Sequence, residues 1–237
     1  MNQQPQKFRC IAADPPWPYE IRGPASSKEH RPNSHGAATS SRERYGAMTI
    51  EELCDRSYKT AVDKGWHDEP RSMGEVTALF HSEVSEALEI WRDPSRTIDE
   101  LWESESGKPE GFVVELADLL IRIGDTCVEM KFPLAKLLSN TTISMLGYGM
   151  EEMVKKSGRT IPELLAHIHV CLSTAYECFV NDDGTRSREE QAAAMLAKAI
   201  AMAGTICRLN GLALEVALIR KMAFNDTRER RHGGKRG

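Results

Sequence analysis

The sequence predicts an all-α protein: a helical bundle of two hairpin-like repeats, the second degenerate, preceded by a short irregular or β-like N-terminal segment. Three observations support this prediction. Apolar residues recur at helical spacing from residue 54 onward, two parts of that region resemble each other, and residues 1–53 lack both features. We therefore place a domain boundary between residues 53 and 54.

The composition is typical of a globular protein of the cytoplasm. The 237 residues are 41% hydrophobic and 28% charged, and the net charge of −4 argues against nucleic acid as a partner. Six cysteines without a CxxC pair indicate reduced thiols, not a disulfide framework or a zinc site. The sequence shows no signal-peptide core and no apolar run of 18 residues, so we expect no membrane span.

The N-terminal segment contains a β-like run at 8–13 that ends in Asp14, Pro15, Pro16 and Trp17. A stretch rich in Gly, Pro, Ser and charge follows at 22–44 and is typical of a loop. A helix start then follows, with Thr49 as the N-cap and Glu52 at the capping-box position.

The DPPW motif, together with GAATSSRERYGAMTIEEL, resembles the adenine-N6 DNA/RNA methyltransferase family. The resemblance implies that Asp14 and the Pro15 carbonyl hold the exocyclic amine and that Trp17 stacks on the base. It covers about 50 residues, and one βαβ unit alone takes about 30. We interpret residues 1–53 as a truncated, non-catalytic methyltransferase-like segment; a strand-turn extension of the helical domain is the alternative.

Residues 54–237 are expected to be helical throughout. Charged or Gly- and Pro-bearing loops are predicted at 94–109, 156–159 and 181–186. Periodicity and capping residues predict helices at 54–64, 72–91, 111–131, 134–148, 161–179, 188–209 and 212–228.

Two of these helices carry acid pairs at i, i+3 spacing, which places each pair on one helix face. Glu83 falls inside the apolar stripe of helix 72–91, and Glu86 falls at its edge. A buried carboxylate is costly unless it is paired or metal-bound. Glu115 and Asp118 lie on a polar stripe of helix 111–131 that also holds Asp125. Taken alone, that stripe could be a solvent face.

The repeat retains packing positions and loses the acids. HSEVSEALE at 81–89 resembles HVCLSTAYE at 169–177, and ELADLLIRIGDTC at 115–127 resembles MLAKAIAMAGTIC at 195–207. We interpret about 72–131 as the active hairpin and about 161–228 as its degenerate copy around a pseudo-twofold axis; chance similarity of amphipathic helices is the alternative. The positions of the four acids are taken in the second copy by Cys171, Thr174, Met195 and Lys198.

Inward carboxylates on facing helices suit Mg²⁺, which prefers hard oxygen ligands; Mn²⁺ is a further candidate. The ExxE and ExxD pairs resemble those of the MazG-like nucleoside triphosphate pyrophosphohydrolases, an all-α family related to the dimeric dUTPases. The resemblance also rests on DKGWHDEPRSMGEVTALFHSEVSEALE, GKPEGFVVELADLLIRIGD and IRKMAFNDTRERRHGGKRG. It covers 55–131 and 212–237, whereas 132–211 departs from the short family members.

The resemblance implies hydrolysis of nucleoside triphosphates, with deoxynucleotides or non-standard nucleotides as substrates, to the monophosphate and pyrophosphate. Glu83, Glu86, Glu115 and Asp118 would bind magnesium. Glu86 and Glu83 are the catalytic candidates, with Glu86 as the general base because it lies at the stripe edge. If the second hairpin replaces a partner subunit, the chain needs less oligomerisation than single-hairpin members of the family; a homodimer stays an open alternative.

Further residues are candidates for substrate binding. Lys64 and Trp66 could contact the nucleotide; alternatively, they form an ordinary helix C-terminus. Lys221, Asn225 and Arg228 share one face of the C-terminal helix, and Lys235 follows in the basic tail. The alternative is a frayed basic terminus without a role. His81, His167 and His169 are interpreted as packing or surface residues. The remaining substrate candidates are Asp125, Lys221, Asn225, Arg228 and Lys235.

Two rival functions are retained. One is an adenine-N6 methyltransferase, or its remnant, that uses the DPPW motif. The other is a catalytically inactive helical module that binds nucleotide. Whether the four acids converge within metal-ligand distance is the observation expected to discriminate among the three functions.

Overall fold

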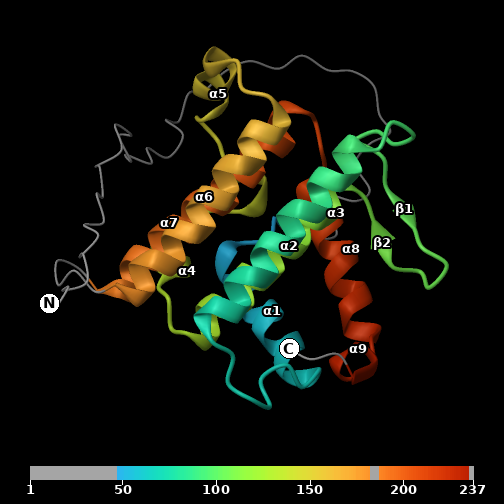
Figure 1. The fold of residues 1–237 in the computed structure, drawn as a ribbon. Coiled ribbons are helices and arrows are strands. Elements are labelled where there is room, and N and C mark those ends of the chain that lie inside the picture. The colour runs from blue at the N-terminus through green and yellow to red at the C-terminus, as the bar shows by residue number, and fades with distance from the viewer. Residues whose placement is uncertain (1–46, 182–186, 235–237) are drawn as a thin grey trace, which may run out of the picture. The chain divides into compact units, whose positions relative to one another are not determined.

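A computed structural model describes residues 47–181 and 187–234 of the chain. The methyltransferase-like motif (Asp14, Pro15, Pro16 and Trp17) and Lys235 lie outside the described residues. The described residues confirm the all-α prediction (Figure 1). The elements are α1 (Ile50–Asp63), α2 (Met73–Arg92), β1 (Trp102–Glu103), β2 (Pro109–Glu110), α3 (Phe112–Glu129), α4 (Leu134–Leu137), η1 (Ile143–Met145), α5 (Glu151–Ser157), α6 (Ile161–Val180), α7 (Arg188–Leu209), α8 (Leu214–Thr227) and α9 (Arg231–Gly234).

The two predicted hairpins form the centre of the bundle. Helix α2 packs on α3, α6 packs on α7, and α2 also contacts α6. Figure 1 shows α6 and α7 running side by side, next to the α2–α3 pair. His81 and His169, 88 positions apart in the chain, stack on each other with their Nδ1 atoms 2.6 Å apart. Equivalent residues of two repeats meet in this way on a pseudo-twofold axis, so these histidines mark that axis.

The repeat continues beyond the two hairpins. The amide of Phe132 donates to the carbonyl of Cys127 after α3, and the amide of Leu212 donates to that of Cys207 after α7, both at 2.8 Å. The helix that follows each hairpin packs on the other hairpin. Helix α4, which follows α3, contacts α7, and α8, which follows α7, contacts α3. This reciprocal exchange brings a helix from the second repeat against the first.

Glycines at equivalent positions allow the close packing of the outer segments. A Cβ at Gly124 would lie 3.3 Å from Cys54 Cα of α1, and a Cβ at Gly204 would lie 2.5 Å from Leu146 Cβ. Helix α1 therefore covers the first hairpin at the place where η1, with its C-cap residue Leu146, covers the second. The first repeat has a helix of 14 residues at this place, and the second has a short 3₁₀ turn.

The predicted helix at 134–148 is wrong. Helix α4 ends at Leu137, and Asn140 takes a left-handed backbone conformation (φ 63°) that a helix cannot continue through. The chain then pairs with residues before α1: Thr142 forms a β-bridge with Thr49. Long-range backbone pairing therefore replaces the helix. Helix α5 and the small β1–β2 hairpin were not predicted, the latter because two-residue strands carry no periodicity.

The predicted boundary at residues 53 and 54 falls inside α1. Thr49 and Glu52 form the predicted capping box, and the helix runs on without a break from Ile50. The amide of Met48 donates to Glu215 of α8 at 2.6 Å. By its contacts, the compact helical unit begins at Ala47.

Helix α7 is long and apolar enough to cross a membrane by length and composition alone. Of its most apolar stretch, 61% is buried inside the bundle. The core helix of a soluble protein passes the same test.

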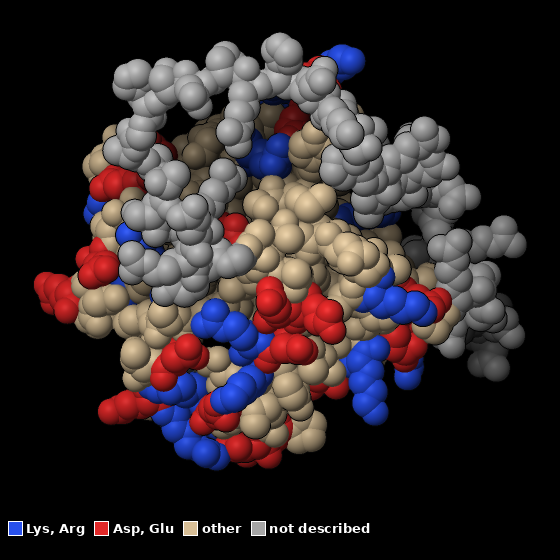
Figure 2. All heavy atoms as spheres, turned by 180° about the vertical axis from the view of Figure 1, so that it is seen from behind, with Lys and Arg blue, Asp and Glu red and all other residues tan. Residues whose placement is uncertain are grey.

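Figure 2 shows basic and acidic side chains of the described residues mixed over the face behind that of Figure 1.

Candidate functional site

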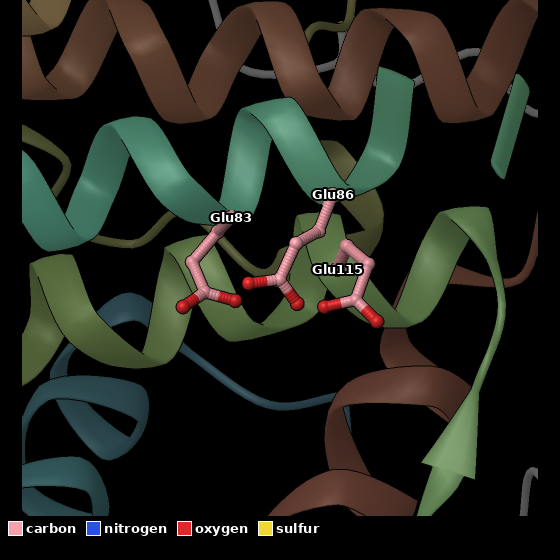
Figure 3. Close-up of side chains that lie close together, drawn as sticks. All are labelled: Glu83, Glu86 and Glu115. Atoms are coloured by element: carbon pink, nitrogen blue, oxygen red, sulfur yellow. The ribbon is translucent and has the colours of Figure 1, made fainter. Parts of the chain in front are cut away.

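Three glutamates converge between α2 and α3 (Figure 3). Glu83 and Glu86 extend from α2 toward Glu115 of α3, and one carboxylate oxygen from each lies within 4.8 Å of the others. Glu83 and Glu115 are only 3% and 2% exposed, whereas Glu86 is exposed. The helical periodicity had predicted this division, with Glu83 in the apolar stripe and Glu86 at its edge. These three residues are called the acid cluster below.

Asp118, the fourth predicted acid, is not part of the acid cluster. Its Oδ2 lies 2.5 Å from Lys221 Nζ of α8, close enough for an ion pair, although the angles do not meet hydrogen-bond geometry. Arg122 Nε similarly donates to Glu83 Oε1 at 2.6 Å. Two of the four acids are thus neutralised by cations from the protein itself.

Burial sets the protonation of the acid cluster. It raises the pKa of Glu115 to about 8, with the negative charge of Asp118 adding to the effect. Burial also raises the pKa of Glu83, although Arg122 acts in the opposite direction. At neutral pH, Glu115 therefore holds a proton that a bound cation would displace.

A cavity of about 370 Å³ lies beside the acid cluster, between α1, α2, α3 and α8. A larger and more open hollow, of about 590 Å³, lies between Glu89 and Trp102, but none of the predicted site residues lines it. We therefore assign the site to the smaller cavity. Its lining residues include nine of the predicted ones: Lys64, Trp66, Glu83, Glu86, Asp118, Asp125, Lys221, Asn225 and Arg228.

Unpaired buried polar atoms gather around this cavity. Within 47–181 and 187–234, five buried side-chain atoms have no hydrogen-bond partner; four belong to lining residues, and the fifth belongs to the acid cluster. A buried polar group left unpaired costs about 1–3 kcal/mol, so such groups call for a ligand or ordered water. The atoms are Ser57 Oγ, Arg71 Nε, Glu115 Oε2, Lys221 Nζ and Asn225 Oδ1.

Cations line the walls that face the acid cluster. Lys221 comes from α8, as the spacing on one face of the C-terminal helix had predicted, and Arg228 is the extended residue that follows the helix end at Thr227. Arg71 and Lys108 also line the cavity, and sequence reasoning missed both. They lie in connections between helices, where periodicity does not define the path of the chain. The one sequence feature that could have identified them is their position in the segments that flank the acid-bearing helices.

Helix α1 ends in a Schellman motif next to the cavity. The amide of Trp66 donates to the Ala61 carbonyl and that of Gly65 to the Val62 carbonyl, each at 2.9 Å, with Gly65 at φ 78°. The alternative of an ordinary helix C-terminus at Lys64 is therefore correct as local geometry. The motif also places Lys64 and Trp66 in the cavity wall, and their contact with a nucleotide stays a prediction.

Asp125 belongs to a half-enclosed ion-pair network at one end of the cavity. His67 lies between Asp125 and Glu129, at 2.7 and 2.9 Å, and Arg71 contacts the same two carboxylates at 2.8 and 2.7 Å. The hydrogen bond to Asp125 raises the pKa of His67, against the lowering by burial. Asp125, predicted to bind substrate, thus anchors the segment that carries Trp66 to α3.

The C-terminal segment closes over the same end. The amide of Arg231 donates to the Lys64 carbonyl at 2.9 Å, and its Nε donates to the Gly65 carbonyl at 3.1 Å. Arg230 pairs with Asp68. These contacts tie α8 and α9 to the α1–α2 connection, so the cavity is built from both ends of the described chain.

The second hairpin has no comparable site in the described residues. Cys171 is buried, Thr174 donates to the carbonyl of Val170 at 2.8 Å, and Lys198 Nζ contacts Met195 Sδ at 4.0 Å. None of these four residues lines the cavity. Comparison with known protein families, curated proteins and solved structures gives no match to this chain.

Proposed function

We propose that the chain is a Mg²⁺-dependent nucleoside triphosphate pyrophosphohydrolase, which converts a nucleoside triphosphate to the monophosphate and pyrophosphate. One observation carries the proposal. The acid cluster, in which Glu83 and Glu115 are buried and Glu115 has an unpaired carboxylate oxygen, adjoins a cavity whose other walls carry Lys221 and Arg228. Acids that can hold a divalent cation, facing cations that can hold phosphate, suit a metal–triphosphate complex.

The residues present fit magnesium. Glu83, Glu86 and Glu115 supply hard oxygen ligands, and Glu115 Oε2 has no competing hydrogen bond. Asp118 could join them on release from Lys221. The same oxygen donors accept Mn²⁺. When bound, the metal ion would neutralise phosphate charge and favour loss of a proton from the attacking water.

The protein's own groups bind, orient and accept a proton. Lys221, Arg228 and Arg122 hold the phosphates, and Trp66 packs beside the nucleoside. The attacking water bonds through its oxygen to the α-phosphorus. Exposed Glu86 takes a proton from that water as the bond forms. The bond from that phosphorus to the bridging oxygen breaks at the same step, and pyrophosphate leaves with the electron pair.

Pyrophosphate release from a panel of ribo- and deoxynucleoside triphosphates with Mg²⁺ tests the proposal. The Glu83→Gln/Glu115→Gln double variant should lose activity by about 1,000-fold or more, because both metal-ligand charges are removed. Thr174→Ala, at the position equivalent to Glu86 in the second hairpin, is the matched control and should retain activity within about two-fold. Activity retained in the double variant overturns the site assignment.

A helical module that binds nucleotide without hydrolysing it is the second candidate. The internal pairs Asp118–Lys221 and Glu83–Arg122 favour it, because they occupy two of the four acids. This candidate predicts binding of Mg²⁺ and nucleotide without release of pyrophosphate. The methyltransferase alternative rests on residues outside the described ranges, and calorimetric titration with S-adenosylmethionine tests it.

A further inference from the structure

We infer that the β1–β2 hairpin is a phosphate-binding arm and that Lys108, in its turn, contacts the phosphate that shares a metal ion with the acid cluster. The inference rests on the proposed function, because it adds a residue to the same site. Lys108 lines the cavity, but it comes from neither of the helices that carry the acids.

The hairpin lies in a connection that is longer in the acid-bearing repeat. Residues 93–111 join α2 to α3, whereas residues 181–187 join α6 to α7. The offset between the repeats accordingly falls from 88 before this connection to 80 after it. The longer connection and the acids thus occur together in the first repeat, and the second repeat has neither. This association is expected if both serve the same ligand.

Local contacts fix the backbone of Lys108. Its carbonyl accepts from the Ser104 amide at 2.9 Å, and its amide donates to Ser104 Oγ at 3.2 Å. Trp102 pairs with Glu110 across the two strands, and the Arg96 guanidinium lies 4.1 Å above the Trp102 ring. The backbone of the arm is therefore held at both strands, and the Lys108 side chain extends from a fixed point.

The charges around Lys108 favour exchange of its partner. Its Nζ lies 3.0 Å from Glu110 Oε1 and 3.1 Å from Oε2. Burial works to lower the pKa of Lys108, but the hydrogen bond to Glu110 and the charges of Glu115 and Asp118 outweigh it and raise that pKa. A divalent cation in the acid cluster would repel the ammonium group and so oppose the attraction of the nearby carboxylates. The ammonium group is then available to a phosphate oxygen.

This arrangement gives Lys108 two effects of opposite sign. In the ligand-free protein, its positive charge repels a metal ion from the acid cluster. In the complex, the same charge attracts phosphate. A lysine that only braced the hairpin would change both affinities in the same direction, through the shape of the site.

Two calorimetric titrations test the inference, each with the full chain. The first measures Mg²⁺ alone, and the second measures an α,β-methylene nucleoside triphosphate analogue at saturating Mg²⁺. Lys108→Gln should bind Mg²⁺ about three-fold more tightly and the analogue about ten-fold more weakly. Lys108→Arg should stay within about three-fold of the wild type in both.

Glu110→Gln is the matched control, because it removes the ion pair of the hairpin and leaves Lys108 in place. It should bind the analogue within about two-fold of the wild type. Opposite changes in Lys108→Gln support the inference. A parallel fall, no change, an equal loss in Glu110→Gln or no Mg²⁺ binding by the wild type overturns it. Both measurements report binding, so a wild type that binds without releasing pyrophosphate would refute only the proposed function.

Discussion

The α2–α3 and α6–α7 hairpins have the same path and different interiors. Their equivalent histidines meet on the pseudo-twofold axis, and their equivalent glycines each admit a covering segment. Buried Glu83 nevertheless corresponds to buried Cys171. The fold is therefore satisfied by an uncharged residue at a position where the first hairpin keeps a carboxylate. Packing does not require the acids, and their burial opposes stability.

The helices that follow the hairpins differ as well. Helix α8, after the second hairpin, has 14 residues and supplies Lys221 and Asn225 to the cavity, and Arg228 follows directly after it. Its counterpart α4, after the first hairpin, has four residues. The second hairpin thus lacks both the acids and a facing cationic helix. The degenerate repeat still contributes to the site, because α8 belongs to it, and it is more than a scaffold.

Removal of the cation that faces the acids should give the largest effect. Lys221 is 2% exposed and pairs with Asp118. Lys221→Met leaves that carboxylate uncompensated beside Glu115, so we expect a loss of about 3 kcal/mol in unfolding free energy without metal. Saturating Mg²⁺ should recover part of it. Urea denaturation measures both.

Lys198→Met is the matched change in the second hairpin. Lys198 faces Met195 instead of a carboxylate, so its loss should change stability by less than about 0.5 kcal/mol. Equal effects of the two lysine variants would contradict the difference drawn between the hairpins.

The equivalent glycines should respond unequally to alanine. A Cβ at Gly204 would come within 2.7 Å of the backbone of Leu146, whereas a Cβ at Gly124 would stay 3.3 Å from its nearest neighbour, Cys54. Gly204→Ala should cost about 2–3 kcal/mol and Gly124→Ala about 1 kcal/mol or less. The midpoints of urea unfolding at neutral pH measure the difference, and a larger loss at Gly124 would reverse the interpretation.

Removing a buried acid should stabilise the metal-free protein. The pKa of Glu115 is raised from 4.5 to about 8, so the folded state binds more protons than the unfolded state between these values. Stability therefore falls as pH rises through this window. At about pH 8.5, Glu115→Gln should gain roughly 2 kcal/mol and lose Mg²⁺ binding.

Met195→Gln, the same change at the equivalent position, should lose about 1 kcal/mol, because it buries an amide among apolar neighbours. Glu89→Gln is the control on α2, since Glu89 is 71% exposed and lies outside the acid cluster. Destabilisation by Glu115→Gln under these conditions would show that the carboxylate has an unseen partner.

The axis histidines should give the smallest effect. Burial lowers the pKa of His81 and His169, so the folded state binds fewer protons and loses stability as pH falls below about 6.5. His169→Gln should reduce that acid-induced loss, by less than about 1 kcal/mol after solvent screening.

His67 has a raised pKa, so His67→Gln should cost stability at low pH, with the cost fading as pH rises. Unfolding midpoints from about pH 5 to pH 8 separate the two signs.

Sequence reasoning succeeded where a local rule acts over a long stretch. The capping box of α1 and the periodicity of six helices were predictable, as was the inward orientation of Glu83. It failed at 134–148, where helical propensity gave way to pairing of Thr142 with Thr49, 93 residues earlier. Contacts between residues so far apart leave no periodic signal in the sequence.

The site was predictable in its acids and less so in their partners. A carboxylate inside an apolar stripe is visible from sequence, and so is a row of cations on one helix face. The ion pairs of Asp118 with Lys221 and of Asp125 with His67 and Arg71 depend on how three helices and a connection meet. For the same reason, the sequence did not predict that Asp118 lies outside the acid cluster or that Lys108 lines the cavity.

The exchange of helices between the repeats has a consequence for the order in which the protein can mature. Lys221 follows Asp118 by about 100 residues, which a ribosome adds in roughly 5–20 s. During that interval, a nascent chain carries an acidic hairpin without its cationic partner. The site can therefore be completed only late in synthesis, and a chain that stops before α8 would carry the acids without Lys221, the cation that pairs with Asp118.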